Sequence, residues 1–344
     1  MITPAAIEIS DADKLVGDPL VSVLMITYNH GAFLAEAIRG VVEQECDFPF
    51  ELIIGEDAST DDTLSVAVEY QKRFPKIIRV VHSIANAGMN ENGKRVFDLA
   101  RGKYVSYCEG DDFWCAPDKL ARQVEIIERD ARVGIVHSDW TKTRLVRGEW
   151  LHDSRKSVHR RVPLRLLEGD LFASWHFPKI LRTCTVLLRR DTIQDLVQSG
   201  LAKTEYRFGD CVLNAFVTSQ FKVAYLPKIT AVYRISPNSA LRSGSKARVD
   251  FYRSALQFDS DARRYFDGSA RYCSGFRWDS AAGLFIWGLR ARDFRAVLDA
   301  LGDFTRHFTL LEFIRTGIST CALRIPTLRR QSREASSTQV SRVG

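Results

Sequence analysis

The stretch VSVLMITYNHGAFLAEAI, residues 21–38, joins two different hydrophobic patterns. Its first seven residues form a continuous apolar run, which is typical of a strand buried on both faces of a parallel sheet. After a short polar segment, apolar residues return at helical spacing at Leu34, Ala37, Ile38 and Val41. The stretch therefore predicts one strand followed by one helix.

The same alternation of strand and helix continues to residue 139. Further strands are predicted at 51–57, 77–81, 103–108 and 133–139. A helix is predicted after each of the first four strands; one ends before Pro75, one covers 93–100, and one opens at Pro117 and runs to Ile127. Strands joined by single helices lie parallel with right-handed crossovers. We therefore expect an α/β fold with a doubly wound, mostly parallel sheet.

The rest of the chain is less regular. Strands are predicted at 183–190 and 221–235, and the segment 206–217 reads as a turn that enters a helix. Helical patterns follow at 247–266, 279–301 and 303–323. We divide the chain into an N-terminal tail (1–18), an α/β domain (19–245), a helical C-terminal extension (246–326) and a disordered basic tail (327–344).

Composition limits the class of protein. The chain has 344 residues, of which 45% are apolar and 26% charged, as in an ordinary globular protein. The N-terminus has no apolar signal region, and no apolar run approaches the ~20 residues of a membrane helix. We therefore expect neither a signal peptide nor a membrane span. The seven cysteines include no CxxC pair, which predicts buried thiols in a reducing compartment.

Three polar clusters follow predicted strands. Thr27, Tyr28 and Asn29 follow the first strand, Glu56-Asp57 the second, and EGDD (109–112) the fourth. Because the carboxyl ends of parallel strands share one edge of the sheet, where ligands bind, we expect the clusters to form one site.

The acidic cluster lies in the stretch YCEGDDFW, residues 107–114. Carboxylates this close repel one another, and a hard cation, Mg²⁺ or Mn²⁺, relieves the repulsion when substrate phosphates complete its coordination. The alternative is a solvated turn in which Asp111 or Asp112 caps the next helix. The chain has neither a GxGxxG nor a GxxxxGK[ST] motif, so dinucleotide-binding and P-loop interpretations are weak.

Three separate stretches together resemble a known family. VSVLMITYNHGAFLAEAI (21–38), IIGEDASTDDT (53–63) and NAGMNENGKRVFDLARGKYVSYCEGDDFWCAPDKLARQVEII (86–127) resemble inverting family 2 glycosyltransferases with the GT-A fold, in particular the subgroup with an EGDDYW-type motif. The resemblance is close over 21–140 and looser to about residue 240. It implies a GT-A-like fold and transfer of a sugar from a nucleotide donor, most simply a UDP-sugar, to a hydroxyl acceptor with inversion.

The resemblance also implies roles for particular residues. Asp112 would bind the metal best, with Asp111 beside it or nearer the sugar, and Glu109 completes the DXD-like group. The residues implied to bind the nucleotide sugar are Thr27, Tyr28, Asn29, Asp57, Asn86, Gly88, Asn92, Asp111 and Arg234. Each has a structural alternative: Asn29 can cap the next helix, Asp57 can start a turn, and the segment 86–88 is a good turn sequence.

Inverting transfer needs a general base for the acceptor hydroxyl. Relatives place this acid shortly before a helix, and Asp210 in FGDC matches that position, with Glu205 as the second candidate. The alternative for Asp210 is a helix N-cap. Relatives often carry Tyr-Arg-x-His after the last core strand, whereas this chain has Ser236 in the final position, and we assign Ser236 no metal role.

Two tryptophans flank the proposed sugar region. We expect Trp140 to pack in the core and leave Trp114 open between core packing and contact with a sugar.

The C-terminal third carries the basic excess. Residues 246–344 hold 17 Lys and Arg against 10 Asp and Glu, whereas residues 1–245 are neutral. Apolar residues and arginines mix in the segment 303–330, which suits an anionic membrane surface beside a lipid-linked acceptor. The alternative is that these helices pack onto the α/β domain. We expect a cytoplasmic protein, peripheral on the inner face of the membrane if the helices bind it.

The expected partners are a nucleotide sugar and a glycan or lipid-linked acceptor. Two other functions remain open: a sugar nucleotidyltransferase, which would release diphosphate, and a non-catalytic nucleotide-sugar binding protein. Nucleic acid is not an expected partner, because residues 1–245 lack interleaved aromatic and basic residues.

Overall fold

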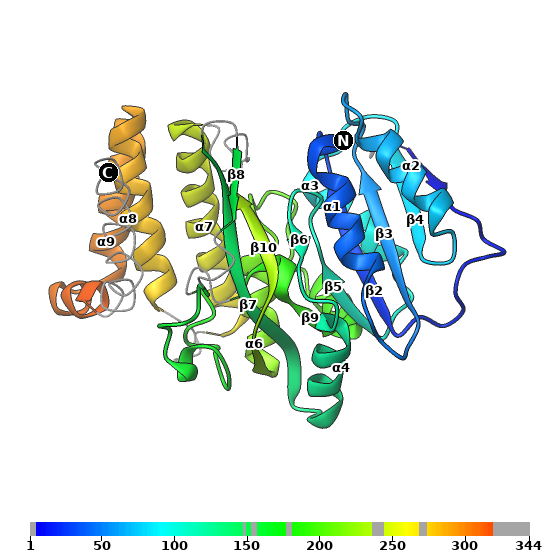
Figure 1. The fold of residues 1–344 in the computed structure, drawn as a ribbon. Coiled ribbons are helices and arrows are strands. Elements are labelled where there is room, and N and C mark those ends of the chain that lie inside the picture. The colour runs from blue at the N-terminus through cyan, green and yellow to red at the C-terminus, as the bar shows by residue number, and fades with distance from the viewer. Residues whose placement is uncertain are drawn as a thin grey trace, which may run out of the picture.

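A computed structural model describes residues 5–146, 149–152, 157–176, 181–235, 244–267 and 274–318. These residues form a central sheet with helices on both faces, and a group of C-terminal helices lies beside it (Figure 1). The elements of the first part of the chain are β1 (Ala6–Ile9), β2 (Val21–Thr27), α1 (Gly31–Val42), β3 (Phe50–Glu56), α2 (Thr63–Arg73), β4 (Ile78–Ser83), α3 (Met89–Asp98), β5 (Tyr104–Tyr107), β6 (Phe113–Trp114) and α4 (Lys119–Arg129).

The later elements complete the sheet and build the helical group. They are β7 (Val133–Val146), β8 (Glu149–His152), the 3₁₀ turns Leu164–Leu166 and Thr183–Thr185, β9 (Leu187–Arg189), α5 (Arg190–Gln198), α6 (Asp210–Gln220), β10 (Lys222–Ile235), α7 (Ser245–Tyr265), α8 (Ser274–Ala291) and α9 (Phe294–His307). A further helical segment covers residues 310–318.

The sheet is mixed but mostly parallel. Its strand order is β1-β4-β3-β2-β5-β9-β7-β10-β6, with β8 paired to β7. Strands β4, β3, β2 and β5 are parallel neighbours, and β7 is parallel to β10. The predicted α/β class with a mostly parallel sheet is therefore confirmed.

One predicted strand is shorter than expected. The predicted strand 183–190 is a 3₁₀ turn followed by the short β9, which is antiparallel to both β5 and β7. Parallel neighbours are usually joined through an α-helix. The described part of the connection from β8 to β9 contains 3₁₀ turns and no α-helix, and β9 runs opposite to β7.

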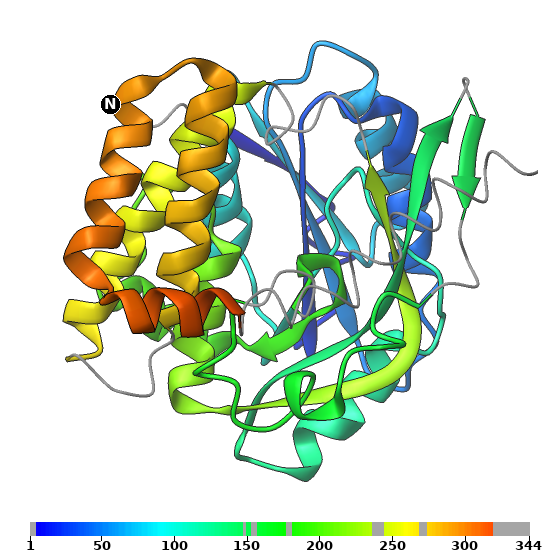
Figure 2. The same cartoon turned by 90° about the vertical axis from the view of Figure 1, so that its left-hand side faces the viewer.

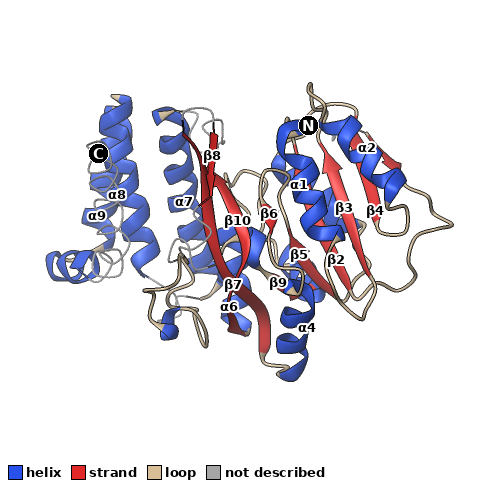
Figure 3. Ribbon diagram, viewed as in Figure 1, coloured by secondary structure: helices blue, strands red, loops and turns tan. Residues whose placement is uncertain are grey.

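Alternate side chains of the buried strands point to opposite faces. Val23 and Leu52 pack in one core, whereas the adjacent Leu24 and Ile53 pack in a second core on the other face. Helices α1, α2 and α4 contribute side chains to the first core, and α3, α5 and α6 contribute to the second. Figure 3 shows helices on both faces of the sheet, which is the doubly wound arrangement.

The first residues add an edge strand. Strand β1, which lies within the predicted N-terminal tail, pairs antiparallel with β4. The guanidinium of Arg79 on β4 donates to both oxygens of Glu8 on β1, at 2.8 and 3.1 Å, and also to the buried Glu51 on β3. This ion-pair network joins β1 to the interior strands.

Helix α7 attaches the C-terminal helices to the domain. Its side chains Ala255, Phe258 and Ala262 share a core with Phe216 of α6 and Tyr206 of the preceding loop. The start of the extension therefore packs onto the α/β domain, which was our alternative to membrane contact.

The predicted helix 279–301 is two helices. Helix α8 ends at Ala291, Arg292 adopts a left-handed φ of 55°, and Asp293 caps α9 by accepting a hydrogen bond from the Ala296 amide. The buried Arg277 of α8 joins the helices, because it donates to Asp259 of α7 and Asp303 of α9.

The predicted segment 303–323 is also divided. Helix α9 continues to His307, and residues 310–318 form the next helical segment. Residues 319–323 and the predicted disordered tail, 327–344, lie outside the described residues. Within the described part of the chain, no helix has the combined length and apolar character needed to cross a bilayer.

Candidate active site

The three polar clusters meet at one edge of the sheet. The Asp57 amide donates to the Thr27 carbonyl at 3.1 Å, and the Gly110 amide donates to the Ile26 carbonyl at 3.1 Å. Asn29 accepts from the Thr60 amide through its side-chain oxygen at 2.8 Å. Hydrogen bonds therefore connect the loops after β2, β3 and β5.

Gly110 allows the acidic loop to approach β2 closely. A Cβ atom at this position would lie 2.6 Å from Thr27 Oγ1 and 3.0 Å from His30 Nδ1. Both of those atoms are buried and have no hydrogen-bond partner. A side chain at position 110 would therefore push the EGDD loop away from the first strand.

Two acids of the EGDD loop converge on a buried thiol. One ligand atom from each of Glu109, Asp112 and Cys184 lies within 4.8 Å of the other two. Burial, with the nearby Asp111, raises the pKa of Glu109 to about 7. Burial, with Asp111 and Glu109, raises the pKa of Asp112 well above its usual range. Negative charge is costly here without a cation.

This donor set fits a divalent cation. Glu109 Oε2 is buried and has no hydrogen-bond partner among the described residues, which is the state expected of a carboxylate oxygen that can accept a ligand. Carboxylates suit Mg²⁺ and Mn²⁺, and a thiol favours softer ions.

Asp112 and Asp111 differ in their surroundings. Asp112 is only 2% exposed, and its Oδ1 accepts from the Arg234 amide of β10 at 2.8 Å. Asp111 is half-buried, and its backbone carbonyl accepts from Arg234 Nη1 at 2.9 Å. Asp112 therefore anchors the loop to β10, whereas the Asp111 carboxylate is the more accessible of the two.

Arg234 packs against the EGDD loop. Its guanidinium pairs with Glu36 of α1 and lies 5.0 Å from the ring centre of Phe33 and 4.7 Å from that of Phe113. The side chain is only 4% exposed. In this structure Arg234 joins β10, α1 and the EGDD loop. The neighbouring Ser236 lies outside the described residues.

Arg182 is a cation that sequence analysis missed. Its guanidinium carbon lies 4.1 Å from the ring centre of Tyr233 and 4.8 Å from that of Trp140. Its charge lowers the pKa values of Glu109 and Asp112, against the larger effect of burial. No motif or hydrophobic spacing identifies Arg182 in the sequence. Its position beside the acids depends on the pairing of the next strand, β9, between β5 and β7.

Lys119 was also missed. Its ammonium is fully buried, hydrogen-bonds Gln123 Oε1 at 2.7 Å and Ser106 Oγ at 3.1 Å, and lies 4.0 Å from the ring centre of Trp114. Burial lowers the pKa of Lys119 to about 7.

Trp114 is buried and donates to the Cys184 carbonyl at 2.9 Å, and Trp140 is buried as expected. Trp114 therefore packs under the site.

Asp57 closes a loop against α3. Its carboxylate accepts from the amides of Ala87 and Gly88 at 2.9 and 2.8 Å, and its carbonyl accepts from the Asn86 side chain. Gly88 has a φ of 85°, which favours glycine. The buried Asn92 donates to the Gly55 carbonyl at 2.8 Å. These predicted nucleotide-binding residues therefore lie together beside the end of β3.

The predicted residues after β2 differ in exposure. Tyr28 is 44% exposed, whereas Thr27 is buried. Asn29 has a φ of 55° and holds the loop 58–60 through its backbone amide and side chain. Of these three residues, Tyr28 has the side chain most open to a ligand.

Asp210 is the first residue of α6 and is exposed. Its Oδ1 accepts from the Cys211 amide at 2.9 Å. Its charge raises the pKa of Glu109, after the larger effects of burial and Asp111. The effect of Asp210 on Glu109 is therefore weak. Glu205 is exposed on the preceding loop.

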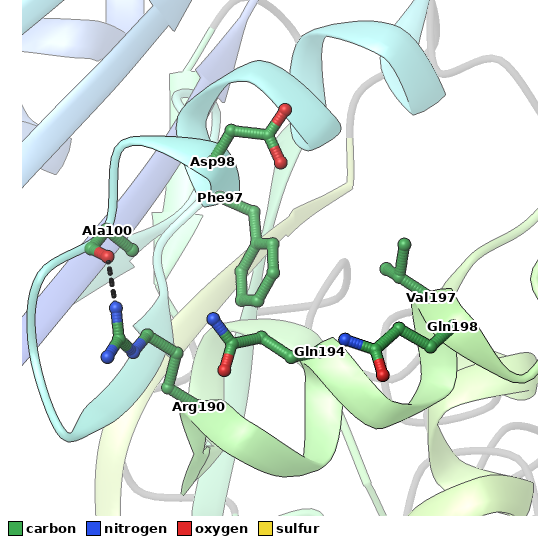
Figure 4. A pocket seen from close by; sticks show the side chains of 7 residues that line it. All are labelled: Phe97, Asp98, Ala100, Arg190, Gln194, Val197 and Gln198. Atoms are coloured by element: carbon green, nitrogen blue, oxygen red, sulfur yellow. Dashed lines mark hydrogen bonds between the residues drawn. The ribbon is translucent and has the colours of Figure 1, made fainter.

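A shallow hollow of about 200 Å³ lies elsewhere, between the end of α3 and α5 (Figure 4). Arg190 crosses it and donates to the Ala100 carbonyl at 2.8 Å. Because Ala100 precedes β5, the hollow lies at the amino edge of the strands, away from the acids.

The architecture and this edge define a GT-A-like α/β protein. A family model described as glycosyl transferase family 2 matches residues 22–193, half of the chain. The chain belongs to glycosyl transferase family 2, and the predicted family and fold are confirmed.

Relatives agree with this membership. The chain is 30% identical over 234 residues to the uncharacterized protein Rv1520 of Mycobacterium tuberculosis, an alignment that covers 67% of this chain and 63% of that relative. It is 33% identical over 109 residues to the putative teichuronic acid biosynthesis glycosyltransferase TuaG of Bacillus subtilis, over 32% of this chain and 42% of TuaG. The chain thus spans less than two thirds of the length of these relatives.

A solved structure has the same fold. The mannosyltransferase PcManGT from Pyrobaculum calidifontis, in complex with GDP-Man and Mn²⁺, superposes with a TM-score of 0.54 at 18% identity and covers 93% of this chain and 85% of that chain. At this identity the likeness describes the fold.

Proposed function

We propose that the protein transfers a sugar from a nucleotide sugar, in the first instance a UDP-sugar, to a hydroxyl acceptor with inversion. The observation that carries the proposal is that ligand atoms of Glu109, Asp112 and Cys184 lie within 4.8 Å of one another at the carboxyl edge of the sheet. Such an edge is where α/β sheets bind their ligands. PcManGT, which shares the fold, is solved with a nucleotide sugar and Mn²⁺.

The donor is proposed to lie across the loops after β2, β3 and β5. Tyr28 and the group of Asp57 with the 86–88 loop would hold the nucleotide, and the EGDD acids would hold Mg²⁺ or Mn²⁺ against its diphosphate. A bound cation supplies Lewis-acid stabilisation of the departing nucleoside diphosphate. Asp111, the more accessible aspartate, would share this cation with Asp112 and Glu109.

The chain's own part in the reaction belongs to Asp210. Its carboxylate would accept the proton of the acceptor hydroxyl as that oxygen attacks the anomeric carbon, while the bond from this carbon to the diphosphate oxygen breaks on the opposite face.

The acceptor is proposed to be a glycan or a lipid-linked glycan at the cytoplasmic face of a membrane. The support is twofold: TuaG carries a name that refers to teichuronic acid biosynthesis, and the C-terminal helices carry a basic, partly apolar surface. A sugar nucleotidyltransferase would use the same edge of the sheet, but it would consume a nucleoside triphosphate and release diphosphate.

The test is a screen of UDP-, GDP- and dTDP-sugars for Mn²⁺-dependent release of the nucleoside diphosphate, followed by Asp210→Asn. We expect Asp210→Asn to lower kcat by about 10²–10⁴-fold and to leave donor affinity unchanged. Asp195→Asn, an exposed acid on α5, is the matched control. A loss with Glu205→Gln instead would move the base to Glu205, and full activity of both variants would overturn the mechanism.

A further inference from the structure

Two neighbouring C-terminal helical segments, which are in contact through Phe304 and Phe313, expose apolar side chains. We call this set the outer face; its members are Phe294, Leu298 and Leu301 on α9 and Leu310, Leu311, Ile314 and Ile318 on the segment 310–318. Phe294 is 73% exposed, Leu310 77% and Leu311 76%. Single exposed apolar residues are common, but a group of seven is a mark of an interaction site.

Helix α9 is apolar on two opposite sides. Phe294, Leu298 and Leu301 follow one another at i, i+4 and i+7 and form one stripe. The buried Ala296 and Ala300 lie on the opposite side, packed in a core with α7 and α8. The inner side accounts for the attachment of α9 to the molecule, and the outer stripe is not needed for it.

The segment 310–318 likewise has an inner side and exposed apolar residues. Its inner side holds Phe313, whose ring centre lies 5.8 Å from that of Trp278, and Gly317, where a Cβ atom would lie 3.0 Å from Trp278. Its four exposed apolar residues occupy the arc of the helix next to this inner side, as their spacing of one, three and four residues requires. Figure 2 shows α9 and this segment nearest the viewer, on the side of the molecule away from the sheet.

Exposed arginines border the outer face. Arg295 and Arg306 follow the apolar stripe of α9 along one flank, and Arg315 lies beside Ile314. Two acids lie near these arginines, and both have partners. Asp299 Oδ2 lies 3.4 Å from Arg253 Nη2, and the Glu312 carboxylate accepts hydrogen bonds from the amide and hydroxyl of Thr309. The face is therefore apolar with a positive border.

We propose that the outer face docks on an anionic lipid bilayer, with the apolar side chains between the lipid headgroups and the arginines against the phosphates. An amphipathic helix with this composition binds in the plane of the interface, and each arginine near an anionic surface adds attraction. A second copy of the chain fits less well, because a two-fold contact brings the same arginines toward each other. The proposal deepens the proposed function by giving the side that faces a lipid-linked acceptor.

The experiment is sedimentation of the full chain with vesicles. We expect the protein to bind vesicles of phosphatidylcholine mixed with phosphatidylglycerol, and to bind pure phosphatidylcholine weakly. Leu298→Ser combined with Leu311→Ser should lower the vesicle affinity at least tenfold. Leu164→Ser, which changes a leucine that is 57% exposed on another surface, is the matched control and should leave it unchanged. Arg295→Gln with Arg306→Gln should remove the preference for the anionic lipid.

Three results would overturn the proposal. The first is no vesicle binding by the unaltered chain. The second is a dimer mass in light scattering that the Leu298→Ser and Leu311→Ser variant converts to a monomer, because a second copy would then cover the face. The third is a fall of several degrees in the melting temperature of this variant, which would mean that the chain itself covers the face. Donor hydrolysis in solution is independent of all three, so loss of that activity with vesicle binding intact would count against the proposed function alone.

Discussion

Arg234 illustrates how a predicted ligand residue can act one layer below the ligand. Its guanidinium is occupied by Glu36, the Asp111 carbonyl and two aromatic rings, and its amide holds Asp112. The family resemblance implied that Arg234 binds the nucleotide sugar directly. The geometry favours a positioning role, because the arginine fixes the loop that carries the acids.

We therefore expect Arg234→Lys to weaken binding of UDP with Mn²⁺ by roughly 10–100-fold, about 1–3 kcal/mol, because an ammonium cannot reproduce the planar contacts of the guanidinium. Isothermal titration with UDP and Mn²⁺ measures this. Arg207→Lys, at an exposed arginine outside the acidic loop, is the control. Unchanged affinity in Arg234→Lys would mean that the loop holds its position without the guanidinium.

At the scale of elements, helix α7 fixes the loop that leads to Asp210. Asp261 of α7 accepts from Lys203 Nζ at 2.7 Å and from the Tyr206 hydroxyl at 2.6 Å. These hydrogen bonds outweigh the opposing effect of burial, which is the largest single influence, and hold the pKa of Asp261 far below its usual range. The C-terminal extension thus supports the loop before α6 through a charged contact as well as an apolar core.

The pH dependence of this contact has a defined sign. The depressed pKa means that ionised Asp261 stabilises the fold fully above the unfolded-state pKa of about 3.9, and that this stabilisation is lost as the pH falls below it. Asp261→Asn should therefore lower the free energy of unfolding by about 1–3 kcal/mol at pH 7, and the deficit should shrink below pH ~4. Urea unfolding of both proteins at several pH values measures the difference; a deficit that does not depend on pH would refute the electrostatic explanation.

At the scale of the whole molecule, ligand binding should raise the melting temperature. A ligand that binds only the folded chain adds about 2.7 kcal/mol when its concentration is a hundred times its Kd, which corresponds to a rise of several degrees for a chain of this size. We expect this rise with UDP and Mn²⁺ together, and we expect Asp112→Ala to abolish it. An equal rise with UDP and a chelator would contradict the proposed role of the acids in binding a cation.

The net charge is unevenly distributed over the whole molecule. The net charge of +7 belongs to residues 246–344, and the described part of that region contributes arginines to the border of the outer face. The acidic edge and the basic surface lie on different parts of the molecule, so the proposed bilayer contact would leave the acids that we propose to hold the cation accessible.

The amino-acid sequence by itself determined the α/β class, the carboxyl ends of β2, β3 and β5 to within one residue, and the meeting of three polar clusters. Continuous apolar runs make buried strands, and parallel strands necessarily bring their carboxyl ends to one edge. Sequence periodicity also located α6 and α7 closely, because each has a long apolar pattern.

Only the tertiary structure decided which partners complete the site. Cys184 and Arg182 reach the acids because β9 enters antiparallel between β5 and β7, and strand order is a property of long-range pairing that local patterns do not encode. The break at Arg292 and the engagement of Arg234 likewise depend on contacts between distant segments. Local patterns are set by neighbours along the chain, whereas the environment of a buried charge is set by every element packed around it.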